Sequence, residues 1–272
     1  MRTRPLALQC AAGVVLIGIS PLLMFWRGSP AAATRPGAPP IVRWKLEIVE
    51  RRPHDQSSFT EGLVYSAGRV FESSGLYGKS SIREVDAKSG KAKVVRPLDA
   101  KLFAEGLALR PDGKLVQLTW KEHVAIVWDP KGLREVARIP FDGEGWGLCY
   151  DPLLKRMIHS DGSSSLWFRD PVSLKRTGSV AVTMNGQPIT QINELECDGK
   201  RVFANIWQTS QIVEIDTTTG YVVGTVDASG LAPADPVPDA VLNGIAKLPG
   251  NTWLISGKLW PTSYVVRFKV AT

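Results

Sequence analysis

The chain has 272 residues, of which 44% are hydrophobic and 22% charged, and its formal net charge is +7. Three of the positive charges lie in the first 33 residues, which contain no acid, so the rest of the chain carries only +4. This mild charge, without a basic stripe and interleaved aromatic residues, argues against nucleic-acid binding, and no nucleic-acid partner is expected.

An uncharged run over residues 6–26 follows Arg2 and Arg4 and precedes three alanines at 31–33. The run is longer than a typical signal-peptide core of about 7 to 15 residues, and it reaches the roughly 20 residues that span a bilayer. Residues 1–33 are therefore interpreted as a hydrophobic leader, either a signal peptide or a membrane anchor held through residues 6–26. Both place the rest of the chain outside the cytoplasm, in a periplasmic or extracellular location, because the positive flank stays inside.

Residues 34–40 contain three prolines and no hydrophobic period, which is typical of a linker. The next stretch, residues 41–51, places apolar side chains at alternate positions, which predicts a strand.

A short motif then recurs five times at spacings of about 41 to 50 residues. The copies lie at residues 59–63, 103–107, 145–148, 192–195 and 242–245. A fixed period of this length, with short strands between turn signals, indicates a β-propeller. We predict an all-β fold with five blades.

Two more strands are expected after each copy. The second strands are predicted at 69–72, 115–120, 156–159, 202–207 and 253–256, and the third at 81–86, 124–129, 165–170, 211–216 and 264–268. Glycine-containing turn signals separate these runs. The last blade has room for one more strand, so the strand at 41–51 is expected to complete it, because an unclosed ring exposes sheet edges. Residues 41–272 then form one domain.

One position of the motif, just before its glycine, holds a polar or an indole side chain. Its occupants are Glu61, Glu105, Trp146, Asn193 and Asn243. The first strand of every propeller blade lines the central channel, so these side chains should face one another. A repeat kept only for packing would explain the glycines and leucines, but it explains the carboxylates and amides poorly.

The ends of the second strands reach the same face and supply Trp120, Trp207 and Lys258. Convergent polar groups walled by aromatic side chains predict a small-molecule pocket. Either tryptophan could instead pack between blades, and Asn243 could hold the channel wall by hydrogen bonds.

The cysteines and histidines predict no metal centre. Cys149 and Cys197 follow the third and fourth motif copies. In an oxidising compartment they could pair, but the sequence does not supply the distance that a disulfide requires, so free buried thiols are expected. His54, His123 and His159 lie far apart and outside any zinc-ligand spacing.

With these motifs the chain resembles the glutamine cyclotransferase family, the plant and bacterial type of glutaminyl-peptide cyclotransferase. The resemblance covers residues 44–268, and ten motifs in one order carry it. They lie at 59–63, 75–80, 103–107, 118–121, 145–148, 160–162, 193–196, 204–207, 242–246 and 257–260. It implies a five-bladed propeller that converts the N-terminal glutamine of peptides or proteins to pyroglutamate with release of ammonia, without a metal or another cofactor.

The resemblance further implies that Glu105 is the catalytic acid and base. The rest of the implied pocket is Phe59, Glu61, Phe103, Trp120, Trp146, Asn193, Trp207 and Lys258. The plant enzymes carry glutamine at the position of Glu61, so a binding role is expected there. We expect Lys258 and Asn193 to stabilise the charge that develops on the substrate's carbonyl oxygen, and Asn243 is counted with the substrate-binding residues.

Two other functions remain open at this point, together with the oligomeric state, for which a monomer is expected. A calcium-dependent propeller lactonase or hydrolase would also place glutamate and asparagine on the axis, and it would lose activity with a chelator. A non-catalytic binding propeller would turn over nothing.

Overall fold

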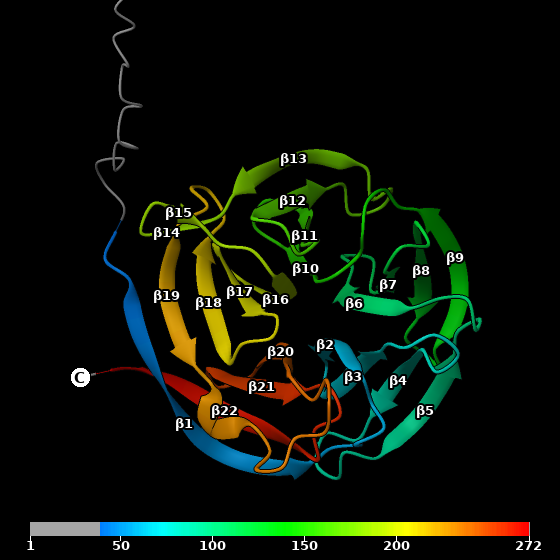
Figure 1. The fold of residues 1–272 in the computed structure, drawn as a ribbon. Helices are drawn as coiled ribbons and strands as arrows, with labels where there is room; N and C mark the ends of the chain where they lie inside the picture. Colours follow the sequence, from blue (N-terminus) through cyan, green and yellow to red (C-terminus); the bar gives the residue numbers. More distant parts are fainter. Residues whose placement is uncertain (1–38, 272) are drawn as a thin grey trace, which may run out of the picture. The chain divides into compact units, whose positions relative to one another are not determined.

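The computed structural model describes residues 39–271, which form five four-stranded blades around a central channel (Figure 1). This architecture confirms the predicted all-β propeller. The expected leader at 1–33 and most of the linker at 34–40 lie outside the described residues.

Within a blade the strands follow one another from the channel outwards. Blade 1 holds β2 (Thr60–Ser66), β3 (Arg69–Ser74), β4 (Ser81–Val85) and β5 (Ala92–Pro97). Blade 2 holds β6 (Ala104–Leu109), β7 (Leu115–Thr119), β8 (Val124–Asp129) and β9 (Arg134–Pro140). Blade 3 holds β10 (Leu148–Asp151), β11 (Arg156–His159), β12 (Ser165–Arg169) and β13 (Arg176–Ala181). Blade 4 holds β16 (Ile192–Asp198), β17 (Arg201–Ile206), β18 (Gln211–Asp216) and β19 (Val222–Asp227). Blade 5 holds β20 (Leu242–Leu248), β21 (Thr252–Gly257), β22 (Thr262–Val270) and β1 (Val42–Pro53).

Burial decreases from the channel to the rim. The innermost strands β2 and β6 are almost wholly buried, whereas the outermost strands β9 and β13 are mostly exposed. The apolar residue after the motif glycine is at most 3% exposed in every copy. These residues are Leu63, Leu107, Leu148, Leu195 and Ile245. The apolar part of the motif therefore packs the core between neighbouring blades.

The glycine of the motif lets neighbouring first strands approach closely. The amide of Gly106 donates to the carbonyl oxygen of Trp146 in the next blade. A methyl group added at Gly106 would lie 2.4 Å from that oxygen, a distance that real Cβ atoms essentially never show. A larger residue at this position would force blades 2 and 3 apart.

The polar position of the motif coincides with a β-bulge. The pairing of the first and second strands shifts register within the motif in four of the five blades. In blade 3 the motif residue Trp146 precedes the strand, so it needs no bulge. Bulges re-aim side chains and occur often beside active sites. The bulge therefore explains how a residue on a buried strand can present its side chain to the channel.

The N-terminal strand β1 closes the ring as predicted. It pairs antiparallel with β22 from Trp44↔Val270 to Pro53↔Thr262. It also forms a short parallel pairing with β19 of blade 4, so blades 4 and 5 share one continuous sheet; the sequence analysis did not predict this contact. The indole of Trp44 donates to Glu214 Oε2 across this seam, at 3.0 Å.

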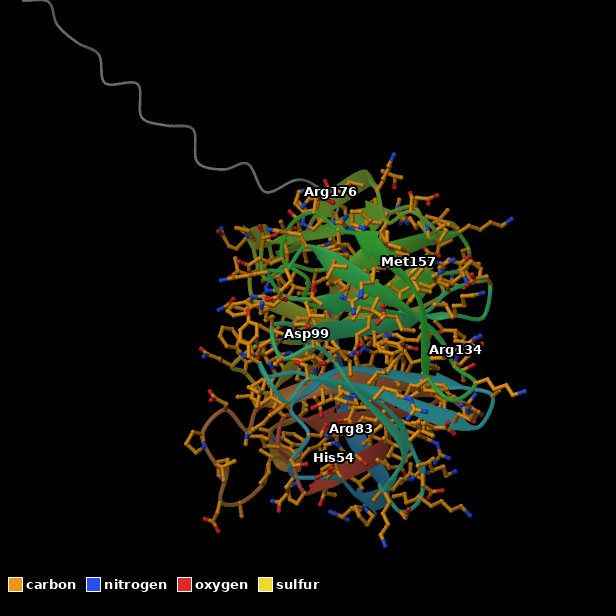
Figure 2. The ribbon with its side chains drawn as sticks, turned by 90° about the vertical axis from the view of Figure 1, so that its right-hand side faces the viewer. His54, Arg83, Asp99, Arg134, Met157 and Arg176 are labelled. Carbon is orange, nitrogen blue, oxygen red and sulfur yellow. A yellow bond between two sulfur atoms is a disulfide. The ribbon has the colours of Figure 1, made fainter. Side chains whose placement is uncertain are left out.

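Polar contacts of the two residues that directly follow β1 connect this end of the strand to blade 1. His54 Nδ1 donates to the carbonyl oxygen of Trp260 at 2.7 Å, and its Nε2 lies 3.0 Å from Glu72 Oε1. The neighbouring Asp55 accepts from Arg83 Nη1 at 2.8 Å. His54 and Arg83 are labelled on the same side of the molecule in Figure 2. The residues that follow β1 therefore connect blade 5, through Trp260, with blade 1, through Glu72 and Arg83.

The loops between blades hold the remaining regular structure. A small hairpin of β14 (Thr183–Met184) and β15 (Gln187–Pro188) lies between blades 3 and 4, and a single 3-10 turn covers Ser229–Leu231. Within residues 39–271, no helix is long and apolar enough to cross a membrane.

The prediction of free cysteines is wrong, because Cys149 and Cys197 form a disulfide. They lie on β10 and β16, the first strands of adjacent blades, with their Cα atoms 5.5 Å apart. This distance is within the range that disulfides require. It arises from the packing of one blade against the next, which local sequence does not show.

Candidate active site

A cavity of about 200 Å³ opens where the first strands begin and the second strands end. Nine of its lining residues are ones expected from the sequence: Phe59, Glu61, Phe103, Glu105, Trp120, Trp146, Asn193, Trp207 and Lys258. Three more were not expected: Gln208, Asp239 and Val241. The structure therefore brings the predicted pocket residues together from all five blades.

Asn243 is the one predicted site residue that does not line the cavity. It is fully buried, and its Nδ2 donates to Glu61 Oε2 and to the carbonyl oxygen of Thr60, both at 3.0 Å. Its assignment as a substrate-binding residue is therefore corrected. Asn243 holds Glu61 in place by a hydrogen bond. Its contacts therefore fit the alternative given above, in which it supports the channel wall by hydrogen bonds.

Glu61 and Lys258 form a buried ion pair in the pocket. Lys258 Nζ lies 2.6 Å from Glu61 Oε1, and both side chains are at most 7% exposed. The ammonium also lies 4.5 Å from the centre of the Phe59 ring. Since an unpaired buried charge is strongly unfavourable, each of these two groups is stable in its charged form only beside the other.

Glu105 lies beside this pair and is 6% exposed. Burial raises the pKa of the Glu105 carboxyl well above its usual range, and the negative charge and hydrogen bond of Glu61 raise it further. Burial also raises the pKa of Glu61, but Lys258 and Asn243 favour its charged form. Of the two carboxyls, Glu61 is therefore the more readily ionised, and the pKa of Glu105 is raised the more strongly.

Asn193 presents an amide to the pocket. It is 2% exposed, and its Oδ1 is buried without a hydrogen-bond partner among the residues described. Buried polar groups are normally paired, so an unpaired amide oxygen in a cavity wall is suited to accept a hydrogen bond from a ligand.

Aromatic rings form the walls. Phe59 and Phe103 meet edge to face at 6.2 Å between ring centres, and Trp146 and Trp207 meet in the same way at 5.6 Å. Phe103 also packs on Trp120 at 5.6 Å. These apolar walls contribute to the burial of the carboxyl groups, which is the largest cause of the raised pKa of Glu105.

A glycine at the end of β3 makes room for the wall. A methyl group added at Gly75 would lie 2.5 Å from Phe103 Cε1 and 3.0 Å from Glu61 Cγ. Any larger residue at this position would push the ring or the carboxylate into the cavity.

Two further carboxylates, the buried Glu194 and the partly buried Glu196, support the backbone of neighbouring first strands. Glu194 accepts from the amides of Leu63 and Ile245, and Glu196 accepts from the amide of Lys247. These contacts give both carboxylates a structural role. In the part of the chain that the structure describes, no group of three or more histidine, cysteine, aspartate or glutamate residues is arranged to hold a metal ion.

Four residues near the pocket were missed by sequence analysis. Gln208 follows Trp207 directly, but Asp239 and Val241 lie in a long connection between blades 4 and 5 that carries no motif. The fourth is Glu144, whose carboxylate accepts from the indole of Trp120 and from that of Trp146. Only its position two residues before Trp146 could have pointed to Glu144 in the sequence.

Comparisons with known proteins agree with this geometry. Residues 22–268 match the family model described as glutamine cyclotransferase. The chain is 37% identical over 237 residues to a glutaminyl-peptide cyclotransferase of Arabidopsis thaliana, which covers 84% of this chain and 72% of that protein. The crystal structure of Myxococcus xanthus glutaminyl cyclase superimposes with a TM-score of 0.79 at 39% identity, covering 85% of this chain and 100% of that one.

Proposed function

The chain belongs to the glutamine cyclotransferase family, and we propose that it acts as a glutaminyl-peptide cyclotransferase through the pocket that contains Glu105. The substrates are peptides or proteins that begin with glutamine, and the products are the pyroglutamyl chain and ammonia. The observation that carries this proposal is a buried carboxyl with a raised pKa, enclosed by aromatic rings beside an ion pair.

The reaction needs proton transfer and no co-substrate. The α-amine nitrogen bonds to the carbon of the side-chain amide, closing a five-membered ring, and the bond from that carbon to the amide nitrogen breaks. The attacking nitrogen loses protons and the leaving nitrogen gains one. A single group placed between the two nitrogens can carry out both transfers.

The raised pKa of Glu105 suits this double role. An α-ammonium group has a pKa of about 7.7 to 8.0, and it cannot attack until it gives up a proton. A carboxylate whose pKa has moved toward this range accepts that proton readily and frees the lone pair. The resulting acid then protonates the leaving nitrogen. The regenerated carboxylate takes the remaining extra proton from the ring nitrogen and passes it to the released ammonia, so that Glu105 ends the turnover as a carboxylate.

The other polar groups stabilise the tetrahedral intermediate in this proposal. The substrate's carbonyl oxygen becomes negatively charged, and Lys258 and Asn193 supply an ammonium and an amide in the same cavity. Glu61 holds the ammonium at 2.6 Å and keeps the pKa of Glu105 high. The rings of Trp120, Trp146 and Trp207 line the cavity and bind the substrate's glutamine side chain by apolar packing.

The test is ammonia release from a short peptide that begins with glutamine, measured with and without a chelator. We expect release at the same rate in both cases. A loss of activity with the chelator would favour a calcium-dependent hydrolase, and no turnover would favour a binding protein.

We also propose that the protein is exported and acts as a monomer in the periplasm or outside the cell. The disulfide between Cys149 and Cys197 supports an oxidising compartment. The leader pattern of residues 1–33 supports export, with anchoring through residues 6–26 as the alternative to cleavage. Fractionation of cells and the mass of the mature chain would distinguish a cleaved signal from an anchor.

A further inference from the structure

The two tryptophans on either side of the boundary between blades 2 and 3 share a single hydrogen-bond acceptor. Trp120 follows β7 of blade 2, and Trp146 precedes β10 of blade 3. Trp120 Nε1 donates to Glu144 Oε2 at 2.9 Å, and Trp146 Nε1 donates to the same oxygen at 3.3 Å. Both rings line the cavity, whereas Glu144 does not.

The main chain at Glu144 is fixed by a hydrogen bond from a buried histidine. The Glu144 carbonyl oxygen accepts from His159 Nε2 at 2.8 Å, and His159 is fully buried. Burial and the charge of Arg169 lower the pKa of His159 to about 3, so the ring is neutral. Arg169 Nε lies 3.3 Å from Nδ1, which accepts, so the proton stays on Nε2.

The segment that carries Glu144 is tied to both blades. Arg169 of β12 donates to the carboxylate of Asp142 at 2.6 Å and to its carbonyl oxygen at 2.7 Å. On the other side, the amide of Gly145 donates to the carbonyl oxygen of Trp120 at 2.9 Å. The carboxylate of Glu144 therefore projects from an anchored backbone at the boundary between the two blades.

The other carboxylate oxygen of Glu144 faces a lysine at the rim. Lys121 Nζ lies 3.4 Å from Oε1 and 3.9 Å from the centre of the Trp120 ring. The side chains of Lys121 and Glu144 are 51% and 42% exposed, so this ion pair contributes little by itself. The contacts to the indoles are what distinguish Glu144 from an ordinary surface glutamate.

We infer that Glu144 is a positioning residue that fixes the two indole rings against which the substrate's glutamine side chain packs. This inference rests on the proposed function, because it takes the cavity as the substrate site. Rings that bind the side chain in the ground state and the transition state alike affect mainly KM. Loss of both hydrogen bonds should therefore raise KM about tenfold and leave kcat within about threefold.

Three variants of Glu144 separate geometry from charge. Glu144→Gln retains an oxygen at the same reach, so its KM should stay within about threefold of the wild-type value. Glu144→Asp retains the charge but withdraws the oxygen by one methylene, so its KM should rise like that of Glu144→Ala. If the alanine variant does not fold, the contrast between glutamine and aspartate still decides.

Glu214→Ala is the matched control. It removes the acceptor of the Trp44 indole, a contact of the β1 seam outside the pocket. Its melting temperature should fall while KM stays unchanged. The indole N–H signals of Trp120 and Trp146, followed by NMR, should both move in Glu144→Ala and Glu144→Asp but not in Glu144→Gln.

The outcomes are distinct. A wild-type KM in Glu144→Ala, a KM in Glu144→Gln as high as in Glu144→Ala, or a loss confined to kcat would each overturn the positioning role. A wild-type enzyme that releases no ammonia would instead overturn the proposed function, while the NMR comparison would still show whether Glu144 orders the two rings.

Discussion

Burial is the largest cause of the raised pKa of Glu105, and the charge of Glu61 raises it further. Glu61 is 1% exposed, yet the Lys258 ammonium at 2.6 Å and the Asn243 amide at 3.0 Å both favour its ionised form. That charge is among the causes of the raised pKa of Glu105. A neutral residue of the same shape at this position should therefore lower the pKa of Glu105.

The first prediction concerns Glu61→Gln. Without the Glu61 charge, and with the Lys258 ammonium left unpaired nearby, Glu105 should ionise at a lower pH. The acidic limb of the kcat/KM profile should then move toward lower pH relative to wild type. A limb that stays in place, or moves to higher pH, would show that Glu61 does not control Glu105. The basic limb, to which the substrate's own α-amine contributes, serves as the internal reference.

The repeat predicted which of its side chains share the cavity. Glu61, Glu105, Trp146 and Asn193 converge on one cavity. A bulge in the first strand presents the two glutamates and Asn193, whereas Trp146 precedes its strand. Asn243 occupies the same position of the motif, but its side chain donates a hydrogen bond to Glu61. Glu61 lines the cavity and Asn243 does not. The repeat in the sequence cannot show which of two adjacent side chains reaches the cavity.

At the scale of elements, the sequence predicted the first three strands of each blade from alternation and turn signals. What it could not predict were contacts between blades. The parallel pairing of β1 with β19 and the disulfide between β10 and β16 depend on how closely two sheets pack. The contacts of Glu144 are of the same kind, because it accepts hydrogen bonds from one indole on each side of a blade boundary.

The disulfide gives the prediction at this scale. It closes a loop with a sequence separation of 48 residues, and such crosslinks typically stabilise a protein by about 2 to 4 kcal/mol. Replacing both cysteines by serine should therefore lower the free energy of unfolding by about that amount, as measured in denaturant.

The cysteines do not line the active pocket, so kcat/KM of the folded double variant should stay close to that of wild type. An unfolding free energy equal to that of wild type would contradict the stabilising role. A large loss of kcat/KM without a loss of stability would show instead that the disulfide shapes the active site.

At the scale of the whole molecule, stability depends on closing the ring. His54 follows the closing strand, and it links Glu72 of blade 1 to the carbonyl oxygen of Trp260 in blade 5. Burial alone would lower the pKa of His54, but the charge and hydrogen bond of Glu72 outweigh it and the pKa is raised. The Glu72 pKa is lowered despite its burial, chiefly through the charge of His54.

The pH dependence of stability follows from these two shifts. The His54 contribution is complete below the unfolded-state pKa of about 6.5, and it is lost as pH rises through the raised folded-state value. The Glu72 contribution is present above about pH 4.3 and is lost as pH falls through the lowered value. The pair therefore contributes most between these limits.

Thermal unfolding of wild type and of His54→Gln tests this window. As pH rises above about 6.5, the melting temperature of wild type should fall by more than that of the variant, because glutamine does not titrate. Parallel curves for the two proteins would show that the seam does not depend on a charged His54.

The central claim is that Glu105 moves the proton during cyclisation, and a comparison of Glu105→Gln with wild type tests it most directly. The measurement is ammonia release from a peptide that begins with glutamine, with thermal melts to establish that both proteins are folded. Because an amide cannot relay a proton, the variant should lose about 10²- to 10⁴-fold in kcat while remaining folded. A folded Glu105→Gln variant that releases ammonia at the wild-type rate would contradict the account.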